Sequence, residues 1–200
     1  MIRHYVARRA QVTEGHPHNA AVRTAPLIKH LAGTFCVRAA YGRLVRRVLI
    51  TGMSGTGKSS LIAELAALGY KAVDTDAGWC ELQPDGRQRW REDAIQALLA
   101  TEDTDVLFVA GCEENQVKFH SQFDHIILLS APLEVLRQRL ATRTNNPFGK
   151  SAEESRRFEA DLQEVEPLLR AVAGCEIDTT MLLSDVVRAI LKAVGTEPPA

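Results

Sequence analysis

The sequence has no long apolar run, no paired cysteine motif and few aromatic residues. Aromatic side chains make up 6% of its 200 residues, and its four cysteines stand apart at positions 36, 80, 112 and 175. Because none of them forms a C-x-x-C pair or another metal-ligand spacing, the pattern favours free thiols over a zinc site or a disulfide framework. No stretch has the length of a membrane span or the continuous apolar core of a secretory signal. These absences predict a cytoplasmic protein with no membrane segment.

Acidic residues are nearly missing from the first part of the chain. Residues 1–47 contain nine Lys and Arg against one acid, Glu14, a net charge of +8, whereas residues 48–200 contain 15 basic and 24 acidic residues, a net charge of −9. The first segment lacks a helical or strand period, so we expect residues 1–44 to form a basic, poorly ordered extension. Its arginines have no interleaved aromatic platform, which disfavours a nucleic-acid-binding arm. The alternatives are a transit peptide and a native chain that begins near Val45.

The stretch LITGMSGTGKSSL, residues 49–61, contains the most specific motif of the chain. Four of its residues satisfy the pattern G-x-x-x-x-G-K-[ST], known as Walker A. An apolar strand pattern precedes the glycines, and leucine and isoleucine recur after them at the period of a helix. A glycine loop between a strand and a helix turns its backbone N–H groups inward around an anion, at the positive end of the helix. The motif therefore predicts a phosphate-binding loop, the P-loop. Its residues are Gly52, Met53, Ser54, Gly55, Thr56, Gly57, Lys58, Ser59 and Ser60.

Two side chains of the P-loop have predicted roles beyond the backbone cradle. Lys58 can reach the β and γ phosphates of ATP, which makes it a candidate catalytic residue. The hydroxyl of Ser59 can ligate a magnesium ion that bridges the same phosphates. The sequence therefore predicts that this loop binds ATP and Mg²⁺.

Strand and helix patterns alternate along the rest of the chain. Apolar segments predict strands at 48–50, 70–76, 105–111, 125–132 and 175–180, and helical periods occupy 61–68, 90–100, 133–140, 151–172 and 184–194. Residues 80–88 form a polar connection with a Pro-Asp-Gly turn. We predict one domain over residues 45–200 with the α/β, three-layer P-loop NTPase fold: a mostly parallel five-stranded sheet, helices on both faces and a small lid.

Two aspartates follow the second predicted strand. Ligands of parallel α/β sheets bind at the carboxyl ends of the strands, and in an extended chain Asp74 and Asp76 point to the same side. Phosphoryl transfer needs one carboxylate for the metal and one to orient or deprotonate the acceptor hydroxyl. P-loop proteins usually place the metal carboxylate at the end of the third strand, but here that strand ends without an acid. Asp74 therefore takes the metal role by elimination. An ordinary turn is the alternative explanation.

Arginines precede the bend at residues 144–150, where a lid is expected. Arg139 and Arg143 lie one helical turn apart and could share a face directed at the triphosphate. Cations there would stabilise charge on the transferred phosphoryl group, and closure would exclude water. A solvated basic face is the alternative.

Several segments of the chain resemble a known group of enzymes. VDTD after the second strand, RWRED at the start of the next helix and Gly111 after the third strand resemble the shikimate kinase pattern. MSGTGKSS and TRTNNPFGKSAEE are similar to gluconate kinases, and the resemblance covers residues 46–194. The sequence departs from shikimate kinases in having one glycine at 110–112 in place of three, and in lacking their Arg-Pro-Leu-Leu lid motif.

The resemblance implies a role for each matching residue. Asp74 would assist the metal, and Asp76 would bind or deprotonate the acceptor hydroxyl. Arg91 would hold an anionic group of the substrate, and Gly111 would allow its close approach. Asp178, in the DTT after the last strand, lies where related kinases contact adenine.

Three functions follow from these patterns. The first is a kinase that transfers the γ-phosphoryl group of ATP to a hydroxyl of a small, anionic metabolite. The second is a nucleoside monophosphate kinase, and the third is a regulatory ATPase in which Glu113 and Glu114 orient a hydrolytic water. The expected partners are a nucleotide and a small molecule, with no membrane or nucleic acid, and the expected assembly is a monomer or homodimer.

Overall fold

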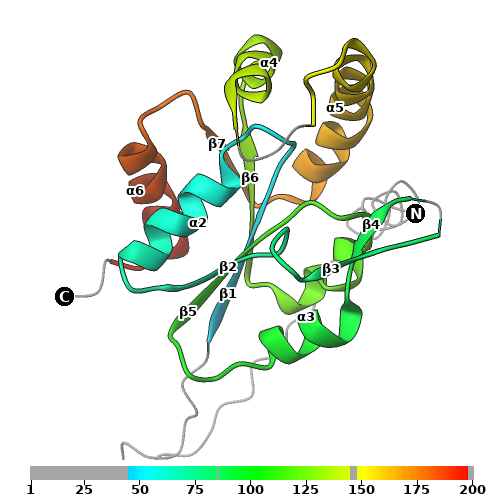
Figure 1. Cartoon of the computed structure of the whole chain (residues 1–200). Helices are drawn as coiled ribbons and strands as arrows, with labels where there is room; N and C mark the ends of the chain where they lie inside the picture. The colour runs from blue at the N-terminus through cyan, green and yellow to red at the C-terminus, as the bar shows by residue number, and fades with distance from the viewer. Residues whose placement is uncertain (1–44, 85, 145–147, 198–200) are drawn as a thin grey trace, which may run out of the picture.

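The computed structural model describes residues 45–84, 86–144 and 148–197 (Figure 1). The predicted basic extension over residues 1–44, with Cys36, lies outside the described residues. Part of the predicted lid, residues 145–147, also lies outside them. Within the described part of the chain, no helix is both long and apolar enough to cross a membrane.

A five-stranded parallel sheet forms the centre of the molecule, as predicted. Its strands, in the spatial order β2-β5-β1-β6-β7, are β2 (Lys71–Asp74), β5 (Val106–Ala110), β1 (Arg46–Thr51), β6 (His125–Ser130) and β7 (Cys175–Asp178). The apolar strand β5 is buried along its whole length because it has neighbours on both edges and helices on both faces. Since β1 is the middle strand, the P-loop that follows it leaves the sheet at its centre.

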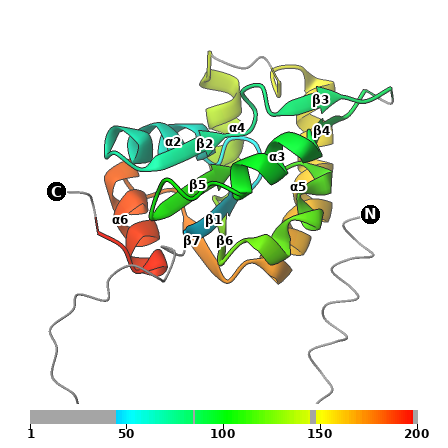
Figure 2. The ribbon, with the colours of Figure 1, turned by 90° about the horizontal axis from the view of Figure 1, so that it is seen from below.

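Helices cover both faces of the sheet, which makes the three-layer fold (Figure 1). Seen from below, α2 (Lys58–Ala67) and α6 (Leu183–Val194) lie on one side, and α3 (Glu92–Leu99) and α5 (Ala152–Val172) on the other (Figure 2). The helix α4 (Leu133–Thr142) stands at the carboxyl ends of the strands. Successive side chains of β1 point to opposite faces of the sheet and pack against different helices. Ile50 packs in the cluster with α2 and α6, and Leu49 packs in the cluster with α3.

Local sequence signals explain where several helices begin and end. α5 starts at a capping box, in which Ser151 and Glu154 each bond the backbone of the other, and this places the helix after the predicted lid bend. α6 ends at Gly195, which adopts a positive φ of 69°. Two short 3₁₀ helices, η1 (Glu114–Lys118) and η2 (His120–Gln122), follow β5 and were not expected from the sequence.

The prediction of a polar connection over residues 80–88 is wrong, as is the start of a helix at Trp90. The chain forms an antiparallel hairpin there, with strands β3 (Cys80–Leu82) and β4 (Gln88–Trp90). The side chain of Asn115 holds the end of β4, because its Oδ1 accepts from the Trp90 N–H at 3.0 Å and its Nδ2 donates to the Trp90 carbonyl at 2.9 Å. This partner lies 25 residues away, so the local pattern does not reveal it.

Gly111 occupies a tightly packed corner between the sheet and this hairpin. A Cβ on Gly111 would lie 2.2 Å from Thr75 Oγ1 and 2.8 Å from the Trp90 ring. Neither neighbour can move freely, because Thr75 Oγ1 donates to the Ala110 carbonyl at 2.7 Å and accepts from Trp90 Nε1 at 2.8 Å, and all of these groups are buried. Internal packing is thus one reason for glycine at this position, whereas the predicted contact with substrate stays a prediction.

We therefore expect Gly111→Ala to destabilise the fold. Overpacking of a rigid corner typically costs about 1–3 kcal/mol, and a broken buried hydrogen bond would add to that cost. Thermal unfolding should show a clearly lowered Tm. Gly174→Ala is a matched control, because a Cβ there would meet only the Ile126 carbonyl, at 3.9 Å. Equal melting temperatures for the two variants would contradict this account of the corner.

Candidate active site

The P-loop has the backbone geometry of an anion cradle. Gly52, Gly55 and Gly57 have positive φ angles of 151°, 86° and 90°, a region that residues with a side chain rarely adopt. Gly52 also approaches the neighbouring strand so closely that a Cβ would lie 2.4 Å from the Leu129 carbonyl oxygen. The turn is closed by Thr56, whose N–H and hydroxyl both donate to the Met53 carbonyl.

The amino end of α2 is available to an anion. Gly57 precedes the helix, and within the described residues no side chain caps this end and no acidic residue lies in its first turn. The first N–H groups of a helix have no partner inside it, and the helix dipole makes this end positive. The loop and the helix end therefore direct N–H groups and positive charge at the same space.

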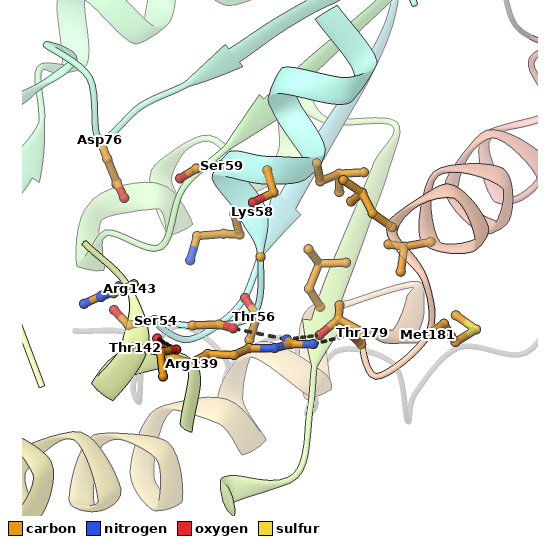
Figure 3. Close-up of a pocket in the computed structure, with 17 residues that line it drawn as sticks. Ser54, Thr56, Lys58, Ser59, Asp76, Arg139, Thr142, Arg143, Thr179 and Met181 are labelled. Atoms are coloured by element: carbon orange, nitrogen blue, oxygen red, sulfur yellow. Dashed lines mark hydrogen bonds between the residues drawn. The ribbon is translucent and has the colours of Figure 1, made fainter. Parts of the chain in front are cut away.

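Lys58 and Ser59 lie at the start of this helix. The Lys58 ammonium donates to the carbonyls of Gly52, at 2.7 Å, and Met53, at 3.3 Å, so its side chain is folded across the loop. Ser59 is exposed, and its hydroxyl is on the same turn (Figure 3). Both side chains thus border the space into which the N–H groups point.

A cavity of about 510 Å³ opens over the P-loop. It is lined by loop residues 54–61, by Asp76 after β2, by Arg139 and Arg143 from α4 and beyond it, and by Thr179 and Met181 after β7. In Figure 3 the charged ends of Asp76 and Lys58 point toward a common space, and Arg143 lies at its edge. Six predicted site residues do not line this cavity: Gly52 and Met53 at the start of the P-loop, and Asp74, Arg91, Gly111 and Asp178.

Arg139 and Arg143, predicted to act together, have different environments. Arg139 joins three parts of the site, because its guanidinium donates to the Gly55 carbonyl at 3.2 Å and to the Thr179 hydroxyl and carbonyl at 2.9 and 2.5 Å. Arg143 donates to the Phe148 carbonyl at 2.9 Å and interacts electrostatically with Asp76. Arg139 therefore ties the P-loop to the segment after β7, while Arg143 interacts with Asp76, which lines the same cavity.

Alanine substitutions should separate these two arginines. If the cavity binds the triphosphate as the sequence predicts, Arg143→Ala is expected to lower the rate of phosphoryl transfer roughly tenfold with little change in Tm, because it removes a charge that lines the cavity. Arg139→Ala is expected to lower Tm and weaken ATP binding, because the P-loop loses its link to Thr179. Turnover, ATP affinity and Tm measured on both variants would check this. Equal changes of all three quantities in the two variants would contradict separate roles for the two arginines.

The two aspartates also differ. Asp74 is the last residue of β2, and its Oδ1 accepts from the Asp76 N–H at 3.1 Å, which orients the turn. Asp76 reaches the cavity from the side opposite the P-loop (Figure 3). Loss of water around its carboxyl group raises the pKa of Asp76, and the nearby Asp74 raises it further, whereas Lys58 and Arg143 lower it. The site therefore holds a carboxylate whose basicity is increased.

Two predicted metal ligands, Ser59 and Asp74, carry the hard oxygen donors that Mg²⁺ prefers. Ser59 lines the cavity at the P-loop, whereas Asp74 does not line it, so a metal contact of Asp74 stays a prediction. Among the described residues there is no group of three or more His, Cys, Asp or Glu placed to hold a metal by themselves.

Glu113 and Glu114, which the sequence pattern treats as a pair, are separated by the fold. Glu114 lies 3.5 Å from both Arg87 and Arg89 of the hairpin. Glu113 interacts electrostatically with Asp76 and Lys58; burial, and then Asp76, raise the pKa of Glu113 to about 7. The sequence offers no local signal for this difference, which depends on how the chain turns after β5.

The opposite end of the cavity is apolar. Met181 and Leu183 line it and are 43% and 39% exposed. Such a surface suits one face of a planar ring, and sequence reasoning did not identify it. Asp178, predicted to lie near adenine, uses its side chain to accept from the Thr180 N–H at 2.8 Å. It shapes the turn that leads to this surface.

Comparisons with known proteins identify the family of the chain. The family model described as an AAA domain matches residues 48–160, more than half of the chain. The chain is 28% identical over 175 residues to a shikimate kinase of Halorhodospira halophila, an alignment that covers 80% of this chain and 99% of that protein.

Two solved structures have the same fold. The shikimate kinase from Acinetobacter baumannii in complex with shikimate is 19% identical, with a TM-score of 0.57 over 76% of this chain and 94% of that one. A gluconokinase from Sinorhizobium meliloti is 21% identical, with a TM-score of 0.52 over 75% and 91% of the two chains. The chain therefore belongs to the AAA-domain family of P-loop proteins, with the P-loop kinase fold of the shikimate and gluconate kinases.

Proposed function

We propose that the protein is a kinase that transfers the γ-phosphoryl group of ATP to a hydroxyl of a small molecule. The observation that carries this proposal is the convergence of Lys58, Asp76 and Arg143 on one cavity above the P-loop. A P-loop alone supports nucleotide binding. A carboxylate facing the P-loop lysine across the cavity supports transfer to a second substrate, since it can accept the proton of a hydroxyl group.

The two ends of the cavity suit the two ends of the nucleotide. The P-loop N–H groups and Lys58 would hold the phosphates, and Met181 with Leu183 would lie against the base. Ser59 and Asp74 would hold Mg²⁺, which supplies charge neutralisation on the β and γ phosphates when bound. Arg139, which donates to Gly55 of the P-loop and to Thr179, would fix the position of the P-loop relative to the segment that carries Met181.

The residues of the chain can support each part of the transfer. Asp76 would take the proton of the acceptor hydroxyl as the acceptor oxygen bonds to the γ phosphorus. The bond between that phosphorus and the bridging oxygen breaks at the same time, and ADP leaves with the electron pair. Lys58 and Arg143 would stabilise the negative charge on the phosphoryl oxygens. The raised pKa of Asp76 makes it a better proton acceptor than an ordinary aspartate.

A transfer assay tests the proposal. The purified full chain would be incubated with Mg²⁺, ATP and a panel of hydroxyl compounds, and the products would be followed by phosphorus NMR. We expect ADP together with a phosphorylated panel member. Bound ATP with only inorganic phosphate as product, in the presence of every panel member, would overturn the kinase proposal and favour a regulatory ATPase.

A further inference from the structure

The segment that carries Asp76 leaves the sheet just after β2. The Thr75 N–H still donates to the Ala110 carbonyl of β5, at 2.9 Å, as a strand residue would. Asp76, the next residue, is exposed and reaches the cavity from the side opposite the P-loop, which is the acceptor side in the proposed reaction (Figure 3). Burial in the core therefore does not hold Asp76 itself, and its position depends on how the residues on either side of it are held.

Thr75 is fully buried and is held by hydrogen bonds with a defined direction. Its hydroxyl accepts from Trp90 Nε1 at 2.8 Å and donates to the Ala110 carbonyl at 2.7 Å. Because an indole N–H can only donate, the hydroxyl must use its own proton on the carbonyl. The Thr75 carbonyl accepts from the Cys80 thiol at 3.3 Å. Thr75 is thus tied at its side chain and at both of its backbone polar groups.

Trp90, the first donor in this chain of bonds, is fixed by residues far from it in the sequence. Its side chain is 1% exposed, and its ring packs against Phe119 with the ring centroids 5.9 Å apart. The side chain of Asn115 bonds the N–H and the carbonyl of Trp90, at 3.0 and 2.9 Å. None of these three residues lines the cavity. The position of the indole therefore does not depend on contacts inside the cavity.

The other side of the Asp76 segment is held by the same end of the hairpin. The Arg91 N–H donates to the Trp79 carbonyl at 2.8 Å, and the Arg91 guanidinium donates to the Gly78 carbonyl at 2.9 Å. Since Trp90 and Arg91 are neighbours at the end of β4, the hairpin holds the segment both before and after Asp76. Only residues 76 and 77 lie between these two anchors, so the carboxylate has little freedom to move.

We infer that Trp90 and Thr75 are positioning residues for Asp76: the indole N–H, acting through the Thr75 hydroxyl, fixes the direction from which the Asp76 carboxylate enters the cavity. This rests on the proposed kinase function, in which Asp76 accepts the proton of the acceptor hydroxyl. A displacement of about 1 Å between reacting groups can lower a rate by about a hundredfold. The hairpin thus contributes to the rate of transfer, although neither Trp90 nor Thr75 lines the cavity.

Thr75→Val tests this role, because valine has nearly the same shape as threonine and lacks the hydroxyl. The full chain would be assayed with Mg²⁺, ATP and the acceptor found in the transfer assay, at a temperature below the unfolding range of every variant. We expect kcat to fall roughly tenfold while the KM for Mg-ATP stays within about twofold of wild type. Thr75→Ser keeps the hydroxyl and should restore kcat to within about twofold. A wild-type kcat in Thr75→Val would overturn the inference.

Two further variants separate positioning from a general loss of structure. Trp90→Phe breaks the same hydrogen bond from the other partner and keeps an aromatic ring, so it should show the same fall in kcat and takes the place of Thr75→Val if that variant does not fold. Thr104→Val is the matched control, since it removes a hydroxyl that donates to the Val106 carbonyl, at 2.9 Å, at the opposite end of β5. An equal fall in kcat in this control would overturn the inference.

A double-mutant cycle with Asp76→Asn shows whether the effect passes through Asp76. If the hydrogen bond acts by placing the carboxylate, Thr75→Val or Trp90→Phe should change the residual rate of Asp76→Asn by less than about twofold. A further tenfold loss in that background would overturn the inference and leave the kinase proposal standing. Failure of the wild-type chain to transfer phosphate to any panel member would instead overturn the kinase proposal, and the positioning role with it.

Discussion

Lys58→Ala should reduce phosphoryl transfer by roughly a thousandfold, the largest effect we expect from a single side chain of this protein. The lysine is part of the P-loop, and its ammonium donates to the carbonyls of Gly52 and Met53. ATP would replace these two carbonyls with phosphate oxygens. The substitution therefore removes charge stabilisation from the reacting group while leaving the apolar core untouched.

The fold of the Lys58→Ala variant should survive. Circular dichroism and thermal unfolding would check this next to the turnover measurement. Lys118→Ala is a suitable control, since Lys118 pairs with Glu92 on the exposed surface and such pairs contribute little to stability. Wild-type turnover in the Lys58 variant would show that the loop does not act on a nucleotide.

Asp76→Asn should lower phosphoryl transfer by roughly a hundredfold or more while Mg-ATP affinity stays close to wild type. Its carboxylate faces the acceptor side of the cavity and accepts the hydroxyl proton in the proposed reaction, whereas asparagine has nearly the same shape and cannot accept that proton. Turnover with the best acceptor and ATP binding by calorimetry would separate the two effects.

Asp74→Asn provides the comparison. If Asp74 holds the metal, this variant should weaken the Mg²⁺-dependent part of ATP binding as well as the rate. Asp103→Asn, an exposed aspartate paired with Lys71, should change neither quantity. If Asp76→Asn and Asp74→Asn both transferred phosphate at the wild-type rate, the aspartates would have no catalytic role and Glu113 would be the next candidate.

Local patterns predicted most of the fold. The apolar runs of the five parallel strands, the helical periods and the Walker A motif each depend on residues close together in the chain, and the structure confirms all five strands and the three-layer arrangement. The P-loop could be recognised because its glycines, Lys58 and Ser59 must occur at fixed spacing to form the turn. A strand, its loop and the following helix are encoded within about 20 residues, so periodicity is sufficient to find them.

Contacts between distant segments account for what the patterns missed. The β3-β4 hairpin depends on Asn115 bonding the backbone of Trp90, and Arg139 takes a different role from Arg143 because Thr179, 40 residues further on, accepts its hydrogen bonds. Glu113 and Glu114 are adjacent and chemically alike, yet Glu113 interacts electrostatically with Asp76 and Lys58 while Glu114 forms ion pairs with the arginines of the hairpin. Periodicity describes which face of a strand or helix is apolar. It carries no information about which polar groups meet once strands and loops from different parts of the chain are brought together, and those contacts decide which charged groups line the cavity.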